Sequence, residues 1–206
     1  MPSFNQIIMM ALAFLTALTV HEYAHARAAL AAGDDTAKLA GRISLNPLDH
    51  LDPLGTIMFV FMMLHGFGIA WGKPVPVNPY RFRNPRWDSV RVSLWGPLSN
   101  VITAAALAVL LRAILLPVGS AYVLLVVVCI QINLMLAVFN MIPIPPLDGS
   151  KVLAGLLPVE SARRYEYTMG RYGLIILLVM LVTGIVGWII LPPISILFTL
   201  LTGLHL

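Results

Sequence analysis

Long uncharged apolar segments, separated by shorter polar connections, organise the chain. There are six of them: Phe4–Val20, Leu54–Trp71, Val92–Leu111, Val118–Ile142, Gly173–Leu191 and Pro193–Leu204. Most are long enough, or nearly long enough, to cross a hydrocarbon core of about 30 Å as a helix. Backbone groups in lipid must pair within the protein, and no long alternating strand pattern is visible. These segments are therefore predicted to be helices.

The composition supports a membrane protein. Hydrophobic residues make up 59% of the 206 residues, charged residues only 11%, and the mean hydropathy is +0.90. We expect an all-α polytopic bundle of about five to six transmembrane helices, with a re-entrant or interfacial segment and a short hairpin between the first and second full spans. The net charge of +4 could suggest nucleic acid, but the basic residues lie beside the spans, so no nucleic-acid partner is expected.

A cluster of ionisable residues, VHEYAHA at positions 20–26, follows the first apolar segment. His21 and His25 are four residues apart, so on a helix they share one face, with Glu22 beside the first. Two neutral imidazoles so placed can bind zinc, and the carboxylate can take a proton from water. The alternative is a polar helix end that meets water. Ionisable residues beside a long apolar run are costly and usually functional, which favours the metal.

A catalytic zinc needs a third protein ligand, and Asp148 is the best candidate. It lies in NMIPIPPLDG, residues 140–149, directly after a long apolar segment that the prolines must end. Its alternative role is to cap a short helix over Gly149–Leu157. The HExxH motif at the end of another span favours the metal.

Three motifs together carry a family resemblance: HEYAH, a downstream GPLSN at 96–100 that opens a span, and NMIPIPPLDG that closes another. In this order they resemble the site-2 protease family of intramembrane zinc metalloproteases. The resemblance implies that His21, His25 and Asp148 bind one zinc ion per chain and that Glu22 is the general acid/base. It also implies that Asn140 lies in the active site, although Asn140 could instead pair with loose carbonyls at a helix end.

The resemblance gives an expected function: a zinc metalloendopeptidase that cleaves membrane-spanning protein substrates in or near their transmembrane segments, as in regulated intramembrane proteolysis. No PDZ or CBS domain fits, so residues 1–206 are expected to form one membrane-embedded domain, with a catalytic core at about 4–157 and additional C-terminal helices at 173–206. Such a protein would be integral to the cell membrane of a prokaryote. The sequence leaves a homo-oligomer open.

Two alternatives to a protease remain, a metal-binding transporter and a non-catalytic scaffold. A transporter needs polar sites staged through the bilayer, whereas the other polar groups in the spans, chiefly Asn100, Gln131 and Asn133, are neutral. A scaffold has no reason to keep Glu22 beside two ligands. Asn100 itself could support the active site, but packing between helices is the more ordinary role.

Ligands of one ion must lie at one depth, and this constrains the topology. His21 and Asp148 both follow the ends of apolar segments, so these two segments must run in the same direction. Leu54–Trp71 then cannot be a single full crossing, and the glycines and prolines after it favour a re-entrant or interfacial segment. This topology puts 12 of the 13 basic residues on one side, opposed only by Arg112, whereas a full crossing divides them 9 to 4. We therefore expect the active site near the cytoplasmic face.

The polar stretch GKPVPVNPY at 72–80 contains prolines that cannot donate ladder hydrogen bonds. It is either a proline-rich loop or, as the family resemblance suggests, part of a membrane-inserted hairpin that pairs with an extended substrate.

Overall fold

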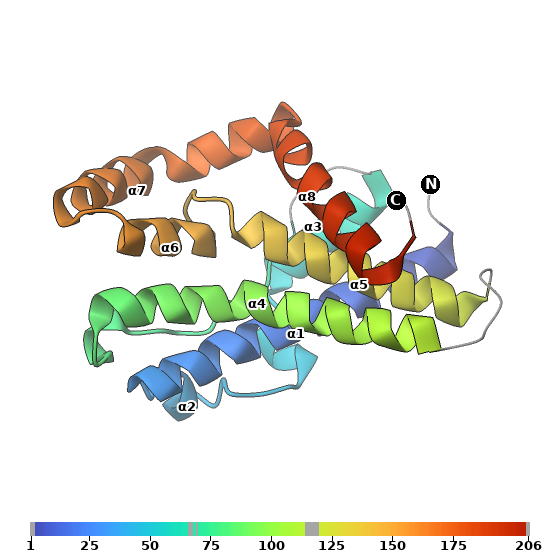
Figure 1. Cartoon of the computed structure of the whole chain (residues 1–206), viewed down its shortest axis with the longest axis horizontal. Coiled ribbons are helices and arrows are strands. Elements are labelled where there is room, and N and C mark those ends of the chain that lie inside the picture. The colour runs from blue at the N-terminus through green and yellow to red at the C-terminus, as the bar shows by residue number, and fades with distance from the viewer. Residues whose placement is uncertain (1–2, 66–67, 69, 114–119, 205–206) are drawn as a thin grey trace.

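The computed structural model describes residues 3–65, 68, 70–113 and 120–204, and within them every regular element is a helix (Figure 1). Parts of the predicted segments 54–71 and 118–142 lie outside the described residues. The elements are α1 (Phe4–Ala32), α2 (Thr36–Leu39), η1 (Pro47–His50), α3 (Pro53–His65), η2 (Pro79–Arg81), α4 (Pro85–Ala113), α5 (Ala121–Asn140), α6 (Asp148–Leu156), α7 (Val159–Val182) and α8 (Ile185–Thr202). Five of them, α1, α4, α5, α7 and α8, are long and apolar enough to cross a membrane. The chain is an integral membrane protein.

Helices α1, α4 and α5 lie side by side and form the centre of the bundle (Figure 1). Ser3 begins α1 with a capping box to Gln6, and Gly33, at φ 107°, ends it in the left-handed conformation. The helix therefore continues past Val20 to Ala32, and the HEYAH motif lies inside it. The expectation that the motif stands at a helix end was wrong, because the alanine-rich stretch after His25 keeps a strong helix propensity.

The chain enters and leaves the α3 region at the same place. At its start Asp52 accepts hydrogen bonds from Gly55 N–H at 2.7 Å and from the Trp71 indole Nε1–H at 3.1 Å. Lys73 N–H donates to the His50 carbonyl at 2.9 Å, so the chains entering and leaving the segment lie side by side. A helix of 13 residues is about 20 Å long, too short for a crossing. The segment is thus re-entrant or interfacial, as expected from the zinc argument.

One face of α3 packs against the bundle, where the rings of Phe59 and Phe14 stack with centroids 4.8 Å apart. Residues 70–78 carry no strand, so the described part of this region is an extended segment without the ladder of a β-hairpin. The prolines of this segment explain the absence of a ladder, since Pro74 and Pro76 have no N–H to donate.

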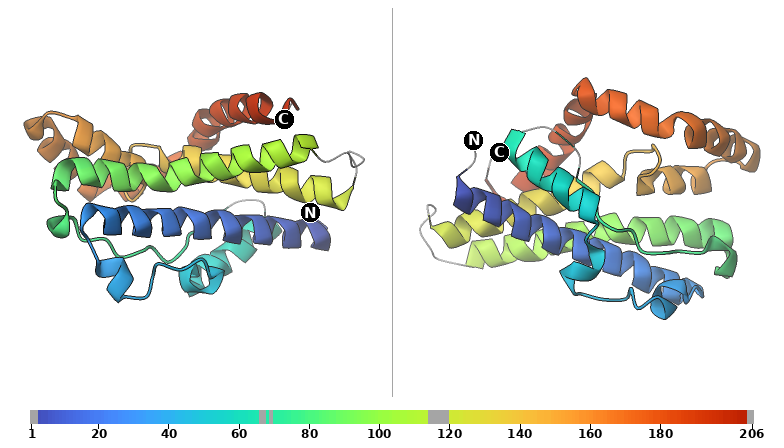
Figure 2. Two further views of the ribbon diagram at one scale, coloured as in Figure 1. Left: turned by 60° about the horizontal axis from the view of Figure 1, so that its bottom comes forward. Right: turned by 180° about the vertical axis from the view of Figure 1, so that it is seen from behind.

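The C-terminal part differs from the predicted spans. Gly184, at φ 77°, separates α7 from α8, so Gly173–Leu191 is not one helix. The left-handed glycine provides the break, and it stands inside an apolar run where hydropathy alone shows no boundary. Helix α8 turns sharply away from α7 but still runs toward the end of the molecule at which α1 begins (Figures 1 and 2).

The half of the bundle away from HEYAH is held by an apolar core between α4, α5 and α8. Its buried members are Ala104, Ala108, Ile130, Leu134, Ile194 and Phe198. Small alanines on α4 let α5 and α8 approach closely, so this core fixes α4 and α5 as a rigid frame for the polar site beneath it.

Candidate metal centre and active site

The two histidines of α1 lie against a glycine of α4. His21 and His25 are 3% and 8% exposed, and their rings fill the space in which a side chain at Gly96 would stand. A Cβ atom built at Gly96 would meet His25 Nε2 at 2.3 Å and His21 Cε1 at 2.7 Å. The missing side chain at Gly96 thus permits close helix packing, and the groups that pack there are the two imidazole rings.

Asp148 reaches the same place from the start of α6. It is the first residue of that helix, directly after the N-cap residue Leu147, and it is 7% exposed. The capping alternative is therefore wrong. Gly149 permits this placement, since a Cβ atom there would lie 2.3 Å from the Met141 carbonyl oxygen.

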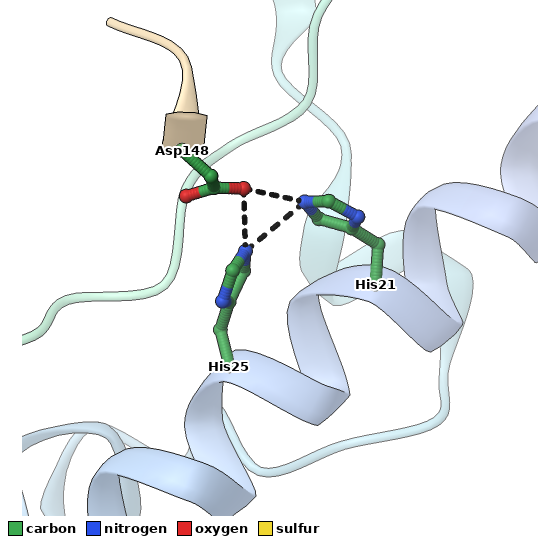
Figure 3. Close-up of side chains that lie close together, drawn as sticks. All are labelled: His21, His25 and Asp148. Carbon is green, nitrogen blue, oxygen red and sulfur yellow. Dashed lines mark hydrogen bonds and ion pairs between the residues drawn. The ribbon is translucent and has the colours of Figure 1, made fainter. Parts of the chain in front are cut away.

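Three potential ligand atoms converge, although the residues lie up to 127 positions apart in the chain (Figure 3). Asp148 Oδ2 lies 3.2 Å from His21 Nε2 and 3.0 Å from His25 Nε2, and the two Nε2 atoms are 3.0 Å apart. Tetrahedral zinc with bonds of about 2.0–2.1 Å separates its ligands by about 3.3 Å. The spacing therefore fits a zinc-sized ion bound by these three residues.

The hydrogen bonds of the outer ring nitrogens determine which imidazole nitrogen faces the centre. His25 Nδ1 lies 2.8 Å from the Val92 carbonyl oxygen, and His21 Nδ1 lies 2.7 Å from Asn100 Oδ1. Both partners accept, so each neutral ring carries its proton on Nδ1 and turns the Nε2 lone pair inward. Three acceptors that face one another repel unless a cation lies between them, so the donor set fits a metal ion.

The electrostatics favour an ionised carboxylate at Asp148. Burial alone would raise the pKa of Asp148, but imidazoles of His21 and His25 that carry a proton on Nε2 hold the pKa below its usual value, and a bound cation would take the place of those protons. The other carboxylate oxygen, Oδ1, lies 3.9 Å from Lys151 Nζ, a largely exposed cation on the next turn of α6. The residue is therefore a charged ligand at neutral pH.

Glu22 lies beside the centre and is held by the extended segment that follows α3. Its Oε2 accepts a hydrogen bond from Val75 N–H at 2.8 Å. Glu22 and the three ligands line one cavity of about 280 Å³, together with Pro74, Val77, Ser93, Asn140 and Lys151. A peptide segment brought to this cavity would meet both the metal ligands and the carboxylate.

Asn140 lines the cavity at the end of α5, and its Nδ2–H donates to the Leu136 carbonyl at 2.9 Å. Both readings of Asn140 are thus present, as a helix-end residue and as a residue of the candidate site. Asn100 is fully buried and touches His21 directly, so it belongs to the site rather than to packing alone.

Sequence reasoning missed two partners in this site, the Val92 carbonyl and the Val75 N–H. Both are backbone groups, which carry no signal in residue type. Pro97, which has no N–H, indicates a break in the α4 hydrogen-bond ladder, but the carbonyl that it frees is that of Ser93, the neighbour of Val92.

Comparison with known proteins supplies the family. The chain is 39% identical over 188 residues to YwhC, a candidate zinc metalloprotease of Bacillus subtilis (strain 168), and the match covers 88% of this chain and 83% of that protein. The sequence model for peptidase family M50 matches residues 115–182. The chain belongs to peptidase family M50.

Two other relatives match less of the chain. Rip2 of Mycolicibacterium smegmatis, also named as a candidate zinc metalloprotease, is 28% identical over 82% of this chain and 65% of its own length. The archaeal protein MJ0611 of Methanocaldococcus jannaschii is 36% identical over 45% of this chain and 48% of its own. No solved structure matches the chain significantly. The M50 match includes Asp148, whereas His21 and His25 lie outside the residues matched by the family model.

Proposed function

We propose that this M50 protein is a zinc metalloendopeptidase that hydrolyses peptide bonds of membrane-spanning protein substrates, within or near their transmembrane segments. The observation that carries the proposal is the convergence of His21, His25 and Asp148 beside Glu22 in one cavity. The relatives named as zinc metalloproteases support zinc as the ion.

The roles follow from the contacts. His21, His25 and Asp148 would hold one zinc ion, which supplies a Lewis acid that acidifies water and polarises a peptide carbonyl. Glu22 takes a proton from the attacking water and passes it to the leaving amine. Its Oε2 is fixed by Val75 N–H, so we assign the proton transfer to Oε1. Asn140 and Asn100 support the site, Asn140 at the cavity wall and Asn100 behind His21.

The substrate must present an extended backbone. A transmembrane helix hides its carbonyls in its own hydrogen bonds, so it has to unwind locally before hydrolysis. In the segment 74–77, Pro74, Val75 and Val77 line the cavity; the prolines have no N–H, and the Val75 N–H donates to Glu22, so the Val77 N–H is the donor left for a substrate backbone. We assign this segment to pairing with the unwound substrate.

We further propose that residues 1–206 form one membrane-embedded domain with its catalytic core at about 4–157, and that the site faces the cytoplasm. The distribution of basic residues, 12 against Arg112 alone, supports this orientation. A site at that face has access to the water that hydrolysis consumes.

A matched pair of variants tests the activity. Purified wild-type protein should cleave single-span substrate proteins in lipid or detergent, and a zinc chelator should stop it. Glu22→Gln should keep zinc and the fold but reduce kcat on the order of 1,000-fold or more, since the amide cannot accept the proton. Glu160→Gln, at an exposed position of α7, is the control and should cleave like wild type. Undiminished cleavage by Glu22→Gln would remove Glu22 from the mechanism.

A further inference from the structure

A line of buried amides connects the candidate metal centre to the middle of α5. Asn100 Nδ2 donates to the Asn133 Oδ1 atom at 2.9 Å and to the Ala17 carbonyl at 2.9 Å. Asn133 Nδ2 in turn donates to the Cys129 carbonyl at 2.8 Å. Asn100 and Asn133 are 0% and 1% exposed, so water cannot replace these contacts. Three central helices thus meet through two amide side chains directly behind His21.

Two backbone carbonyls determine which atom of each amide is the nitrogen and which is the oxygen. A carbonyl oxygen only accepts, so the Asn133 atom facing Cys129 must be the amide nitrogen, and its oxygen must face Asn100. For the same reason the Asn100 atom facing Ala17 must be the nitrogen. The Asn100 oxygen is therefore left for His21 Nδ1, which must carry the proton. The chain of donors ends in an unprotonated Nε2 at the metal centre.

We propose that Asn133 is a positioning residue for the metal centre, which acts through Asn100 to hold His21 in the tautomer that binds the ion. A reversed Asn100 amide would offer N–H groups to His21 Nδ1 and drive the proton to Nε2, where it blocks coordination. With Asn133 in place, reversing the Asn100 amide breaks the two hydrogen bonds that its Nδ2 donates and places its oxygen next to the Ala17 carbonyl and Asn133 Oδ1, which are both acceptors. Without Asn133, only the bond to Ala17 opposes it. Partners behind a ligating histidine commonly change metal affinity 10- to 100-fold.

The inference rests on the proposed function, and the test separates the two. Histidine-¹⁵N-labelled, metal-free protein in lipid bilayers is studied by solid-state NMR near pH 9, well above the ordinary imidazole pKa of about 6.5. The His21 signals, assigned by their absence from His21→Gln, should report protonated Nδ1 and unprotonated Nε2 in the wild type. In Asn133→Leu they should report a mixture of tautomers. This readout needs neither zinc nor activity.

The second readout is metal binding. Asn133→Leu should bind zinc on the order of 10-fold more weakly than wild type in a chelator competition and should change the visible absorption of the Co²⁺-loaded protein. Asn133→Asp, whose carboxyl oxygen can still accept from Asn100, should restore both readouts. Gln131→Leu, a polar-to-apolar change two residues away on α5, is the matched control and should match wild type.

Unchanged tautomers and affinity in Asn133→Leu would overturn the proposal, as would an equal loss in Asn133→Asp, which would assign the effect to packing. If Asn133→Leu does not fold, Asn133→Ala gives the same decision with a smaller side chain. If the wild type binds no zinc, the proposed function fails, while the tautomer readout still decides the role of Asn133.

Discussion

At the scale of single residues, the candidate site depends on the missing side chain at Gly96 of α4 as much as on the ligands. Gly96 leaves room for the two imidazole rings, and Asn100, one turn later on the same face, contacts His21. The α1 and α4 helices can therefore approach until the rings lie directly on the α4 backbone. A methyl group at position 96 would occupy the space of the ligands themselves.

Gly96→Ala should therefore weaken zinc binding by on the order of 10-fold or more and destabilise the fold by about 1–3 kcal/mol, the usual cost of overpacking. Zinc titration and thermal unfolding of the purified protein check both effects. Gly170→Ala is the control, because a Cβ atom at Gly170 meets nothing within 4 Å. Equal zinc affinity in the two variants would contradict the described contact.

Asp34 links the end of α1 to the segment that carries Val75. It is fully buried and accepts from Asn78 N–H at 2.6 Å and from Thr36 N–H at 3.0 Å. Burial alone would raise the pKa of Asp34, but these hydrogen bonds lower it below its usual value. A lowered pKa in the folded state stabilises the protein above the unfolded pKa of about 3.9, and this contribution is lost as pH falls through the folded value.

Asp34→Asn should therefore lower the unfolding temperature at pH 7, and the difference from wild type should shrink as the pH falls below about 4. Thermal unfolding in detergent between pH 3 and pH 7 measures it, with Glu160→Gln as an exposed control. A difference that stays constant across this range would show that the charge of Asp34 contributes nothing.

The residue types of the candidate site could be predicted from the sequence, because HExxH spacing and an aspartate after a proline-broken helix have a direct chemical meaning. The convergence of His21, His25 and Asp148 matches that prediction. The supporting contacts could not be predicted, since the Val75 N–H and the Val92 carbonyl are backbone groups whose positions depend on tertiary packing.

At the scale of elements, α3 shows how an apolar segment can enter the membrane region without crossing it. Gly55 lies against the chain at Trp71, where a Cβ atom would come within 2.1 Å of the Trp71 carbonyl oxygen. The requirement that zinc ligands share one depth predicted this segment correctly. Hydropathy alone could not, and it also missed the continuation of α1 to Ala32 and the break at Gly184.

Single cysteines at Asp49 and Lys73, which flank α3, should react with a membrane-impermeant maleimide from the same side of the membrane. The experiment uses a Cys129→Ser background, because Cys129 is the one native cysteine of the chain. Labelling from opposite sides would show that the segment between them crosses, and the shared depth of His21 and Asp148 would then be lost.

At the scale of the whole molecule, α7 and α8 together form one bent passage that leads back to the end of the bundle where α1 begins (Figure 2). Near the start of this passage, Tyr165 donates to the Pro143 carbonyl at 2.8 Å. Near its end, Arg112 donates to the Leu200 carbonyl at 3.3 Å, at the far end of α4. The five apolar helices therefore include two, α7 and α8, that are joined by a bend and advance toward the same end of the bundle.

Topology reporters fused before Phe4 and after Leu204 should consequently lie on the same side of the membrane, opposite a reporter inserted near Lys38. Reporters at the two ends that lie on opposite sides would show that α7 and α8 cross separately.

The central claim is that His21, His25 and Asp148 bind one zinc ion, and metal analysis of the purified protein tests it most directly. Wild-type protein should hold about one zinc per chain, and both His21→Ala and Asp148→Ala should lose it while remaining folded, because two remaining ligands bind zinc weakly. Asp49→Ala, in the connection before α3, should retain the metal. Zinc that stays at wild-type content in Asp148→Ala would contradict the account.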